Sequence, residues 1–259
     1  MTLFQSILIA LVEGLTEFLP ISSTGHMILA STAMGIHEDE FVKTFEVFIQ
    51  LGAILAIALM YIKRFFRSLT IYFKLITAFL PTAVVGLLAY DYIKAYLFNP
   101  VVVSVSLILG GIILIFIDKK VLQQETTVME VEDLSYKNAF FIGLCQCLSM
   151  VPGTSRAAAT IIGGVFNGLN RKQATEFSFL LAVPTMLAAG GYDLLKSDLA
   201  FSNEQLVLLG VGFVVAFASA WGAVKLFLSY VSTHGFTAFG WYRIALGILF
   251  LIFMWGADL

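Results

Sequence analysis

The sequence predicts an all-α integral membrane protein, with six spanning helices and two re-entrant helix pairs in two inverted-topology repeats. Its 259 residues are 59% hydrophobic and 12% charged, whereas soluble domains carry roughly 25% charged residues. Apolar runs such as 101–117 approach the roughly 20 residues that cross a bilayer as a helix. No alternating pattern typical of a membrane barrel competes with them. Two polar motifs interrupt the remaining apolar sequence at corresponding places in the two halves.

Hydropathy predicts the spanning helices first. They are expected at residues 41–62, 72–90, 101–118, 173–195, 205–229 and 241–257. Two apolar regions remain, 1–33 and 138–168, and each is broken by Pro, Gly and hydroxyl residues, at FLPISSTGH and VPGTSRAAATIIGG. Broken helices at membrane depth are tolerated where they line a buried cavity, so we expect two re-entrant pairs.

The basic residues orient this topology. If the first re-entrant pair returns to its own side, most of the 15 Lys and Arg fall in one set of loops, among them Lys63, Lys74, Lys137 and Arg243. The positive-inside rule makes that side cytoplasmic. The acidic run that begins at Glu38 then lies outside.

An internal repeat accounts for the two broken regions. A shift of 132 positions lays Pro20-Ile21-Ser22-Ser23 on Pro152-Gly153-Thr154-Ser155 and Phe45 on Phe177, and it superposes the spanning helices of the two halves. We therefore divide the chain into a first repeat, 1–132, and a second, 133–259. A re-entrant pair plus three spans in each half gives the halves opposite orientation, as in transporters whose site lies between the repeats.

Glu13 and Glu17 lie at i and i+4, on one face of the first broken helix. A carboxylate at membrane depth costs about 2.5 to 3.5 kcal/mol on insertion scales, and two neighbours repel unless a proton or a cation lies between them. A divalent cation neutralises both, which predicts a metal site at Glu13 and Glu17. The alternative is that one Glu caps a helix or pairs with Arg156. Glu46 is a further site candidate.

The loop after Pro20 contains hydroxyls, free amides and an imidazole. Such a turn can present a nucleophile and bind an anion. Helix capping is the alternative role of the hydroxyls, and Thr24 is the expected cap. In the second broken region Arg156 follows a glycine break, where its guanidinium suits phosphate oxygens. Cation site, nucleophiles, histidine and arginine together favour metal-assisted phosphoryl transfer.

These two motifs resemble those of the undecaprenyl-diphosphate phosphatase family, the bacitracin-resistance type of bacterial membrane phosphatase. EGLTEFLPISSTGH and PGTSRAAAT are similar to its signature segments, and TFEVFIQLGAILA and ATEFSFLLAVP to further ones. The resemblance implies hydrolysis of undecaprenyl diphosphate to the monophosphate, with Mg or Ca, at a site open to the outer face of the cytoplasmic membrane. Ala157 departs from the family, which commonly has Ser there.

The resemblance also implies roles for particular residues. Glu13, Glu17, Ser23, His26 and Arg156 would be catalytic, with either the serine or the histidine as nucleophile. The substrate-binding residues would be Ser22, Thr24, Gly25, Gly153, Ser155 and Thr160.

Partners follow from the same observations. The lipid substrate and the bilayer are the expected partners, and a homodimer is a candidate assembly. The net charge of -2 indicates no nucleic-acid partner. The competing hypothesis is a transporter or flippase for a polyprenyl phosphate or a small anion. It would need an anion site but no nucleophile, so a Ser23→Ala variant separates the two.

Overall fold

The computed structural model describes residues 1–65, 69–97, 100–121, 131–196 and 200–256. Within these ranges every regular element is helical, as predicted. In chain order the elements are α1 (Leu3–Thr16), α2 (Ser23–Ala33), α3 (Glu40–Met60), α4 (Ile62–Phe65), α5 (Leu69–Tyr96), α6 (Pro100–Val121), η1 (Val131–Asp133), α7 (Tyr136–Cys147), η2 (Leu148–Met150), α8 (Arg156–Phe166), α9 (Arg171–Lys196), α10 (Asn203–His234) and α11 (Thr237–Gly256).

Five of the described helices are long and apolar enough to cross a membrane. They are α3, α5, α6, α9 and α10, and they lie at the positions of five of the six predicted spans. The sixth, 241–257, corresponds to α11, whose described apolar part Thr237–Phe253 falls short of that length; residue 257 lies outside the described residues. Six spans therefore stay a prediction.

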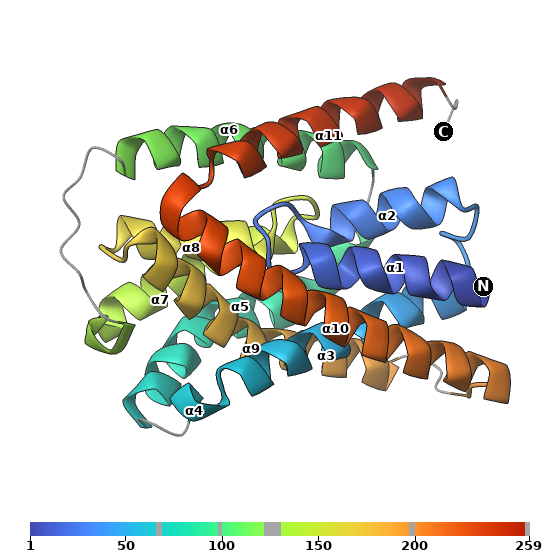
Figure 1. Ribbon diagram of the computed structural model, residues 1–259, viewed down its shortest axis with the longest axis horizontal. Coiled ribbons are helices and arrows are strands. Elements are labelled where there is room, and N and C mark those ends of the chain that lie inside the picture. The colour runs from blue at the N-terminus through green and yellow to red at the C-terminus, as the bar shows by residue number, and fades with distance from the viewer. Residues whose placement is uncertain (66–68, 98–99, 122–130, 197–199, 257–259) are drawn as a thin grey trace.

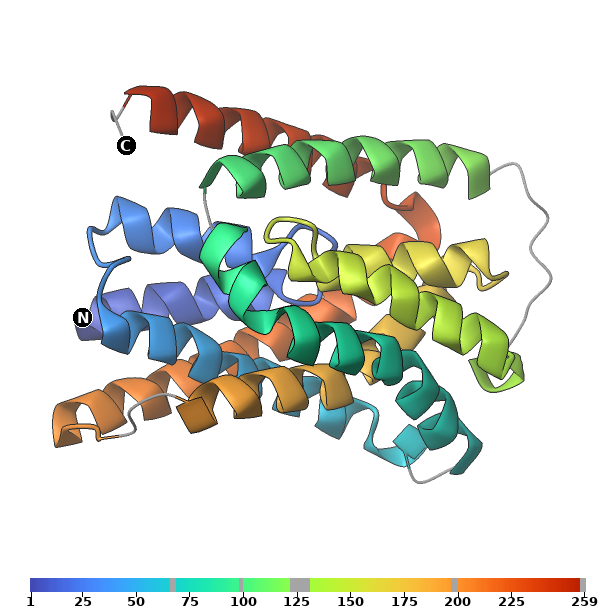
Figure 2. The same cartoon turned by 180° about the vertical axis from the view of Figure 1, so that it is seen from behind.

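Both broken regions form helix hairpins. In the first, α1 packs against α2, and in the second α7 packs against α8. Figures 1 and 2 show that the hairpins extend from opposite ends of the molecule, with their connecting loops near its middle. We call residues 17–22 the first break loop and residues 148–155 the second. The predicted interruptions therefore bring the two motifs together.

The longer helices pack around these hairpins. Three groups of buried side chains form the core of the described residues: a large one mainly on α3, α5, α7, α8, α9 and α10, a smaller one on α1, α2, α3 and α10, and a third on α2, α6 and α11. Close contacts use small residues, as is usual between membrane helices. A Cβ on Gly14 of α1 would lie 2.5 Å from the Ala216 carbonyl oxygen of α10. The α6–α11 pair lies along one side of the molecule (Figure 1).

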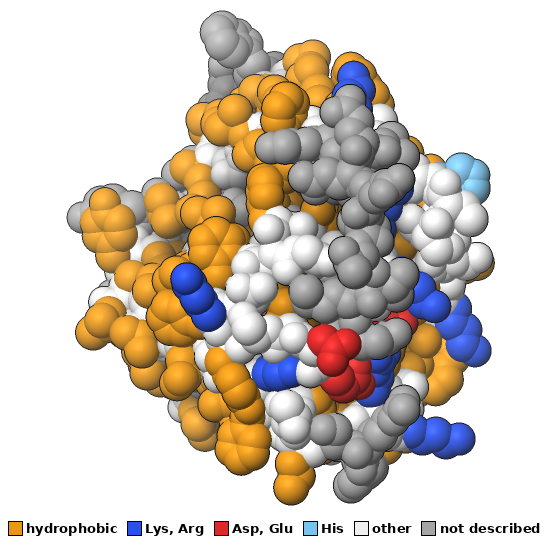
Figure 3. Space-filling model, turned by 90° about the vertical axis from the view of Figure 1, so that its left-hand side faces the viewer, with side chains coloured by type: hydrophobic (Ala, Val, Ile, Leu, Met, Phe, Trp, Pro, Cys, Tyr) orange, Lys and Arg blue, Asp and Glu red, His pale blue; other side chains and the backbone are white. Residues whose placement is uncertain are grey.

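Charged side chains gather at the end of the molecule that holds α4 and the start of α7 and α9. Figure 3 shows Lys and Arg side chains across this end, with acidic groups among them. Arg64 of α4 pairs there with Glu132 at 3.3 Å and also with Glu176 of α9. Arg171 pairs with Asp118 of α6 at 2.7 Å. The basic loops predicted for one side of the membrane therefore lie together.

Two residues of the predicted basic loops are buried within helices instead. Lys74 is buried within α5, where its Nζ donates to the Glu132 carbonyl oxygen. Arg243 is fully buried within α11. Placing these two residues in loops was wrong, although Lys74 does lie at the basic end, beside Glu132. A buried cation whose donors meet backbone carbonyls produces the same local sequence as a cation that flanks a helix.

Candidate active site

Each break loop ends in a serine that caps the following helix. Ser22 (φ 69°) precedes α2 and Ser155 (φ 71°) precedes α8; both adopt the left-handed conformation that non-glycine residues rarely occupy. Each serine Oγ accepts a hydrogen bond from the amide three residues later, from Gly25 at 3.5 Å and from Ala158 at 3.2 Å. Ser22, not the expected Thr24, is therefore the cap, because capping depends on the backbone conformation at the helix boundary.

The two capping serines are 133 residues apart, and so are the N-caps of α1 and α7, Thr2 and Ser135. At the break loops this separation exceeds the predicted shift by one residue. It pairs Ser22 with Ser155 rather than with Thr154. Phe45 and Phe177, which fit a shift of 132, are both fully buried.

Arg243 of α11 links the two break loops. Its guanidinium donates only to backbone carbonyl oxygens: Pro20 at 3.0 Å, Thr154 at 2.9 Å, Gly153 at 2.9 Å, Ser106 at 3.1 Å and Leu107 at 3.3 Å. Five donors in a rigid fork suit such a set. A second link joins the loops directly, since the Ser155 Oγ donates to the Leu19 carbonyl oxygen at 3.4 Å.

A cavity of about 250 Å³ lies between the two hairpins and is also lined by α3 and α9. Its walls carry most of the predicted site residues, and the remaining lining side chains are uncharged. The lining residues are Glu17, Ser22, Ser23, Thr24, Gln50, Ser149, Pro152, Gly153, Ser155, Arg156, Thr185, Met186 and Ala189. Helices α2 and α8 both begin at this cavity, at Ser23 and Arg156, so their positive dipole ends lie beside it.

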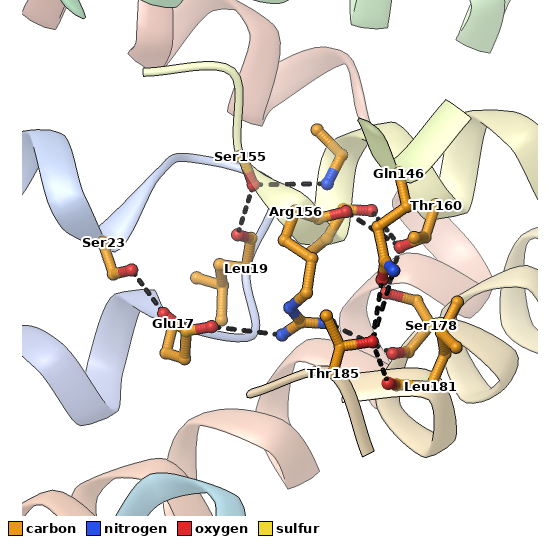
Figure 4. A network of polar contacts seen from close by, with 12 residues as sticks. Glu17, Leu19, Ser23, Gln146, Ser155, Arg156, Thr160, Ser178, Leu181 and Thr185 are labelled. Carbon is orange, nitrogen blue, oxygen red and sulfur yellow. Dashed lines mark hydrogen bonds and ion pairs between the residues drawn. The ribbon is translucent and has the colours of Figure 1, made fainter. Parts of the chain in front are cut away.

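Glu17 connects the two motifs within the cavity. Its Oε2 accepts a hydrogen bond from the Ser23 hydroxyl, and its Oε1 pairs with Nη2 of Arg156 at 3.2 Å. Figure 4 shows the carboxylate between these partners, one from each hairpin. Arg156 and Glu17 are about one-tenth exposed. The salt bridge that the sequence left as an alternative is thus present, and it includes the serine.

One buried nitrogen of the Arg156 guanidinium has no partner among the described residues. The Nη1 of Arg156 donates to the Ser178 carbonyl oxygen at 3.0 Å, whereas its Nε makes no hydrogen bond to them. Thr160, predicted to bind substrate, lies behind the arginine and outside the cavity lining. Its hydroxyl contacts the Arg156 carbonyl at 2.9 Å and the Ser178 Oγ at 2.7 Å. Thr160 and Ser178 therefore support Arg156 rather than facing the cavity.

Glu13 lies deeper than Glu17. It is fully buried, does not line the cavity, and neither of its carboxylate oxygens has a hydrogen-bond partner in the described part of the chain. Glu17 and Glu46 are both within electrostatic range of it. Among the described residues no three Asp, Glu, His or Cys side chains are grouped to hold a metal ion. The unpartnered carboxylate nonetheless fits a cation of the magnesium type, which commonly uses one or two carboxylates and completes its shell with water and substrate phosphates.

His26 lies outside the cavity lining, although it is in the first turns of α2. Its Nδ1 is 2.8 Å from the Ser22 carbonyl oxygen and its Nε2 is 2.7 Å from the Tyr242 hydroxyl oxygen. Gly25 is also outside the lining, and its amide donates to the Ser22 Oγ. The structure therefore brings Glu17, Ser23 and Arg156 together but separates His26 from them.

The sequence did not single out several residues of the site. Arg243, Ser149 and Thr185 were not proposed as site residues. Glu46 was a site candidate, but Gln50, four residues further along α3, lines the cavity and Glu46 does not. Neutral polar residues in apolar helices carry no spacing signal that indicates which partner they face. Ala157 is fully buried in the main core, so a serine hydroxyl there would not join the cavity lining.

Comparison with known proteins identifies the family of this chain. Residues 6–249 match the family described as bacitracin resistance protein BacA. The chain is 52% identical to a Wolinella succinogenes protein named undecaprenyl-diphosphatase, over 98% of this chain and 99% of that one. Proteins of the same name from Persephonella marina and Aquifex aeolicus are 48% and 47% identical to this chain. Each match covers 98% of this chain, and it covers 100% of the first protein and 99% of the second. The chain belongs to the BacA bacitracin resistance family.

Proposed function

We propose that this membrane protein hydrolyses undecaprenyl diphosphate to undecaprenyl phosphate and inorganic phosphate. The observation that carries the proposal is the Ser23 hydroxyl hydrogen-bonded to Glu17, beside Arg156, in a cavity where two helices begin. A nucleophile, a base and an anion-binding group are the parts that phosphoryl transfer needs. Relatives about half identical to this chain are named for that reaction.

The reaction begins with the Ser23 oxygen, which attacks the terminal phosphorus while its proton passes to Glu17. A bond forms between the Ser23 oxygen and the terminal phosphorus, and the bond from that phosphorus to the bridging oxygen breaks. Undecaprenyl phosphate leaves with the bridging oxygen. Water then attacks the phosphoserine, Glu17 returns its proton to the Ser23 oxygen, and the water's proton leaves with inorganic phosphate. Ser23 is favoured over His26 because only Ser23 lines the cavity and faces a base.

Arg156 and the two helix ends stabilise the charge of the transferring group. Arg156 lines the cavity, and a guanidinium binds phosphoryl oxygens strongly. The amides at the start of α2 and α8 add positive dipole ends, which favour an anion. These groups are in place before substrate binds, which reduces the reorganisation needed during the reaction.

Glu13 and Glu17 would hold the divalent cation, Mg or Ca, that the family resemblance implies. When bound, such an ion supplies positive charge to the diphosphate oxygens. Glu13 has two oxygens free for this role. EDTA is therefore expected to lower phosphate release, and added Mg or Ca to restore it.

The chain is expected in the bacterial cytoplasmic membrane, with α1–α2 entering from the outer side and α7–α8 from the inner side. The halves 1–132 and 133–259 would then be inverted repeats. The opposite directions of the two hairpins in Figures 1 and 2 and the basic end in Figure 3 support this orientation. The diphosphate group would reach the cavity while the prenyl chain stays in the bilayer.

Phosphate release from undecaprenyl diphosphate by the purified protein tests the proposal. Ser23→Ala should abolish release, whereas Cys147→Ser, on α7 and outside the cavity lining, should retain it. Full release by folded Ser23→Ala would contradict the assigned nucleophile. No release by the wild type, with lipid phosphate moving across liposome membranes instead, would favour the carrier alternative, which needs no nucleophile.

A further inference from the structure

His26 has a chemically versatile side chain that the proposed reaction leaves unused. Its Nδ1 lies 2.8 Å from the Ser22 carbonyl oxygen, and because a carbonyl only accepts, Nδ1 carries a proton. In the neutral imidazole Nε2 is then an acceptor, so the Tyr242 hydroxyl donates to it at 2.7 Å. The two rings are parallel to within 5°, with centroids 5.5 Å apart. Tyr242, His26 and Ser22 thus form one chain of hydrogen bonds from α11 to the first break loop.

This chain ends on the peptide that carries Ser23. Ser22 has φ 69° and ψ 92°, a conformation that costs a non-glycine residue about 1 to 3 kcal/mol and persists only when the surroundings hold it. The Ser22 carbonyl receives both the His26 ring and the His26 amide, the latter at 3.3 Å. Since Ser22 and Ser23 share a peptide unit, fixing this carbonyl orients the Ser23 hydroxyl towards Glu17.

The second break loop provides a comparison within the same chain. Ser155 has nearly the same φ as Ser22, 71°. Its carbonyl oxygen accepts from the amide of Ala159 at 3.0 Å, four residues on, as the Ser22 carbonyl accepts from His26. Ala159 has no side-chain donor to add. The side-chain hydrogen bond is therefore found on the loop that carries the nucleophile and not at the corresponding position of the other.

We propose that Tyr242 is a positioning residue for the reaction, acting through His26 on the Ser22 peptide to hold the Ser23 hydroxyl against Glu17. The inference rests on the proposed phosphatase activity. It gives Tyr242, which is 46% exposed, a role distinct from that of an aromatic side chain anchored at the membrane interface. It also gives His26 a task other than attack on phosphorus.

Steady-state kinetics of Tyr242→Phe test this role, because the change removes one hydroxyl and keeps the ring. Misorienting the nucleophile should lower kcat by about tenfold, the effect of one lost hydrogen bond, with little change in KM. Trp241→Phe is the matched control, since Trp241 is the neighbouring aromatic residue on α11 and is 61% exposed; its kcat should be unchanged. An unchanged kcat in Tyr242→Phe, or an equal fall in both variants, would overturn the proposal.

A double-mutant cycle separates positioning from a general loss of structure. In His26→Asn the side-chain amide of the asparagine can still donate to the Ser22 carbonyl, but the side chain is too short to reach the Tyr242 hydroxyl. Adding Tyr242→Phe to this background should cause no further fall in kcat. A similar fall in both backgrounds would show that Tyr242 acts independently of His26 and would refute the link.

Nitrogen-15 NMR of labelled protein without substrate gives a measurement that does not depend on catalysis. The His26 signal, assigned by its loss in His26→Asn, should report a protonated Nδ1 and an unprotonated Nε2 in the wild type. It should shift in Tyr242→Phe, and an unshifted signal would overturn the hydrogen-bond chain. The wild type could release no phosphate although the His26 signal shifts in Tyr242→Phe. That result would refute the proposed function and the positioning role, but it would support the hydrogen bond between Tyr242 and His26.

Discussion

Glu17 serves two neighbours at once, a hydroxyl from its own hairpin and a guanidinium from the other. With Arg156 at 3.2 Å and the Ser23 hydroxyl on its second oxygen, the carboxylate joins nucleophile and anion-binding group in one unit. Removing one partner of a buried ion pair is costly, because the other charge is left uncompensated. The side chain therefore contributes both to the chemistry and to the contact between hairpins.

Glu17→Gln tests both contributions. The amide keeps the size of the side chain but cannot accept a proton from Ser23, so phosphate release should fall by about 100-fold or more. Thermal unfolding should occur at a lower temperature, since Arg156 loses its counter-charge. Glu38→Gln is the control, because that side chain is 90% exposed. Wild-type turnover in Glu17→Gln would contradict the role of Glu17 as base.

At the scale of single residues, the sequence predicted the reactive side chains better than the residues that hold them in place. Glu17, Ser23 and Arg156 could be predicted because ionisable and nucleophilic side chains are expensive in apolar segments and default to function. Arg243 could not, since nothing in its local sequence indicates that its donors would find carbonyls of both break loops. His26 was placed at the site by its nearness in sequence, but one helical turn directs its ring towards α11.

At the scale of elements, the α6–α11 pair holds the break loops in place. Arg243 of α11 reaches both loops past Gly110 of α6, where the Cβ of any other residue would overlap its guanidinium. Asp118 near the end of α6 accepts from the amide and hydroxyl of Thr237, which begins α11. The α6–α11 pair therefore places the buried Arg243 guanidinium in the middle of the molecule. There it binds carbonyl oxygens of both break loops.

Gly110→Ala is expected to displace Arg243 without altering any residue of the cavity. Phosphate release should fall by about tenfold or more, because the loss of one or two loop hydrogen bonds, each about 1 kcal/mol, disturbs both halves of the site. The melting temperature should also fall. Gly222→Ala on α10 is the matched control, since a Cβ at that position would have no neighbouring atom within 4 Å. Equal behaviour of the two variants would refute the role given to Arg243.

The helices themselves were largely predictable. The apolar runs located α3, α5, α6, α9 and α10, because a bilayer demands continuous hydrophobicity over a known length. The interruptions located both hairpins, because Pro and Gly end helices. Boundaries were less predictable: α10 runs to His234 rather than to 229, and the cap is Ser22 rather than Thr24, since caps depend on backbone angles that sequence does not specify.

At the scale of the whole molecule, two hairpins from opposite ends supply complementary halves of one site. The first brings the carboxylate and the nucleophile, and the second brings the arginine (Figure 4). The end that holds α4 and the start of α7 carries the basic residues, and the acidic α2–α3 connection lies at the other end. This distribution of charge predicts which end faces the cytoplasm.

Cysteine labelling in intact cells tests that orientation. In a background with Cys145 and Cys147 changed to Ser, Glu38→Cys should react with a membrane-impermeant maleimide. Lys63→Cys, in α4 at the basic end, should react only after the cytoplasmic side is exposed. The reverse pattern would show that the chain is inserted the other way and would move the expected outer site to the inner face.

The most direct measurement of the central claim is the identity of the phosphorylated residue in a single turnover. Purified protein is mixed with undecaprenyl diphosphate labelled at its terminal phosphate, quenched within the first turnover by a denaturant at neutral pH, where phosphohistidine and phosphoserine both survive, and digested for mass spectrometry. The account predicts phosphate on Ser23, absent in Ser23→Ala and reduced in Glu17→Gln. Label on His26, or phosphate released in the first turnover with Ser23 never modified, would contradict it.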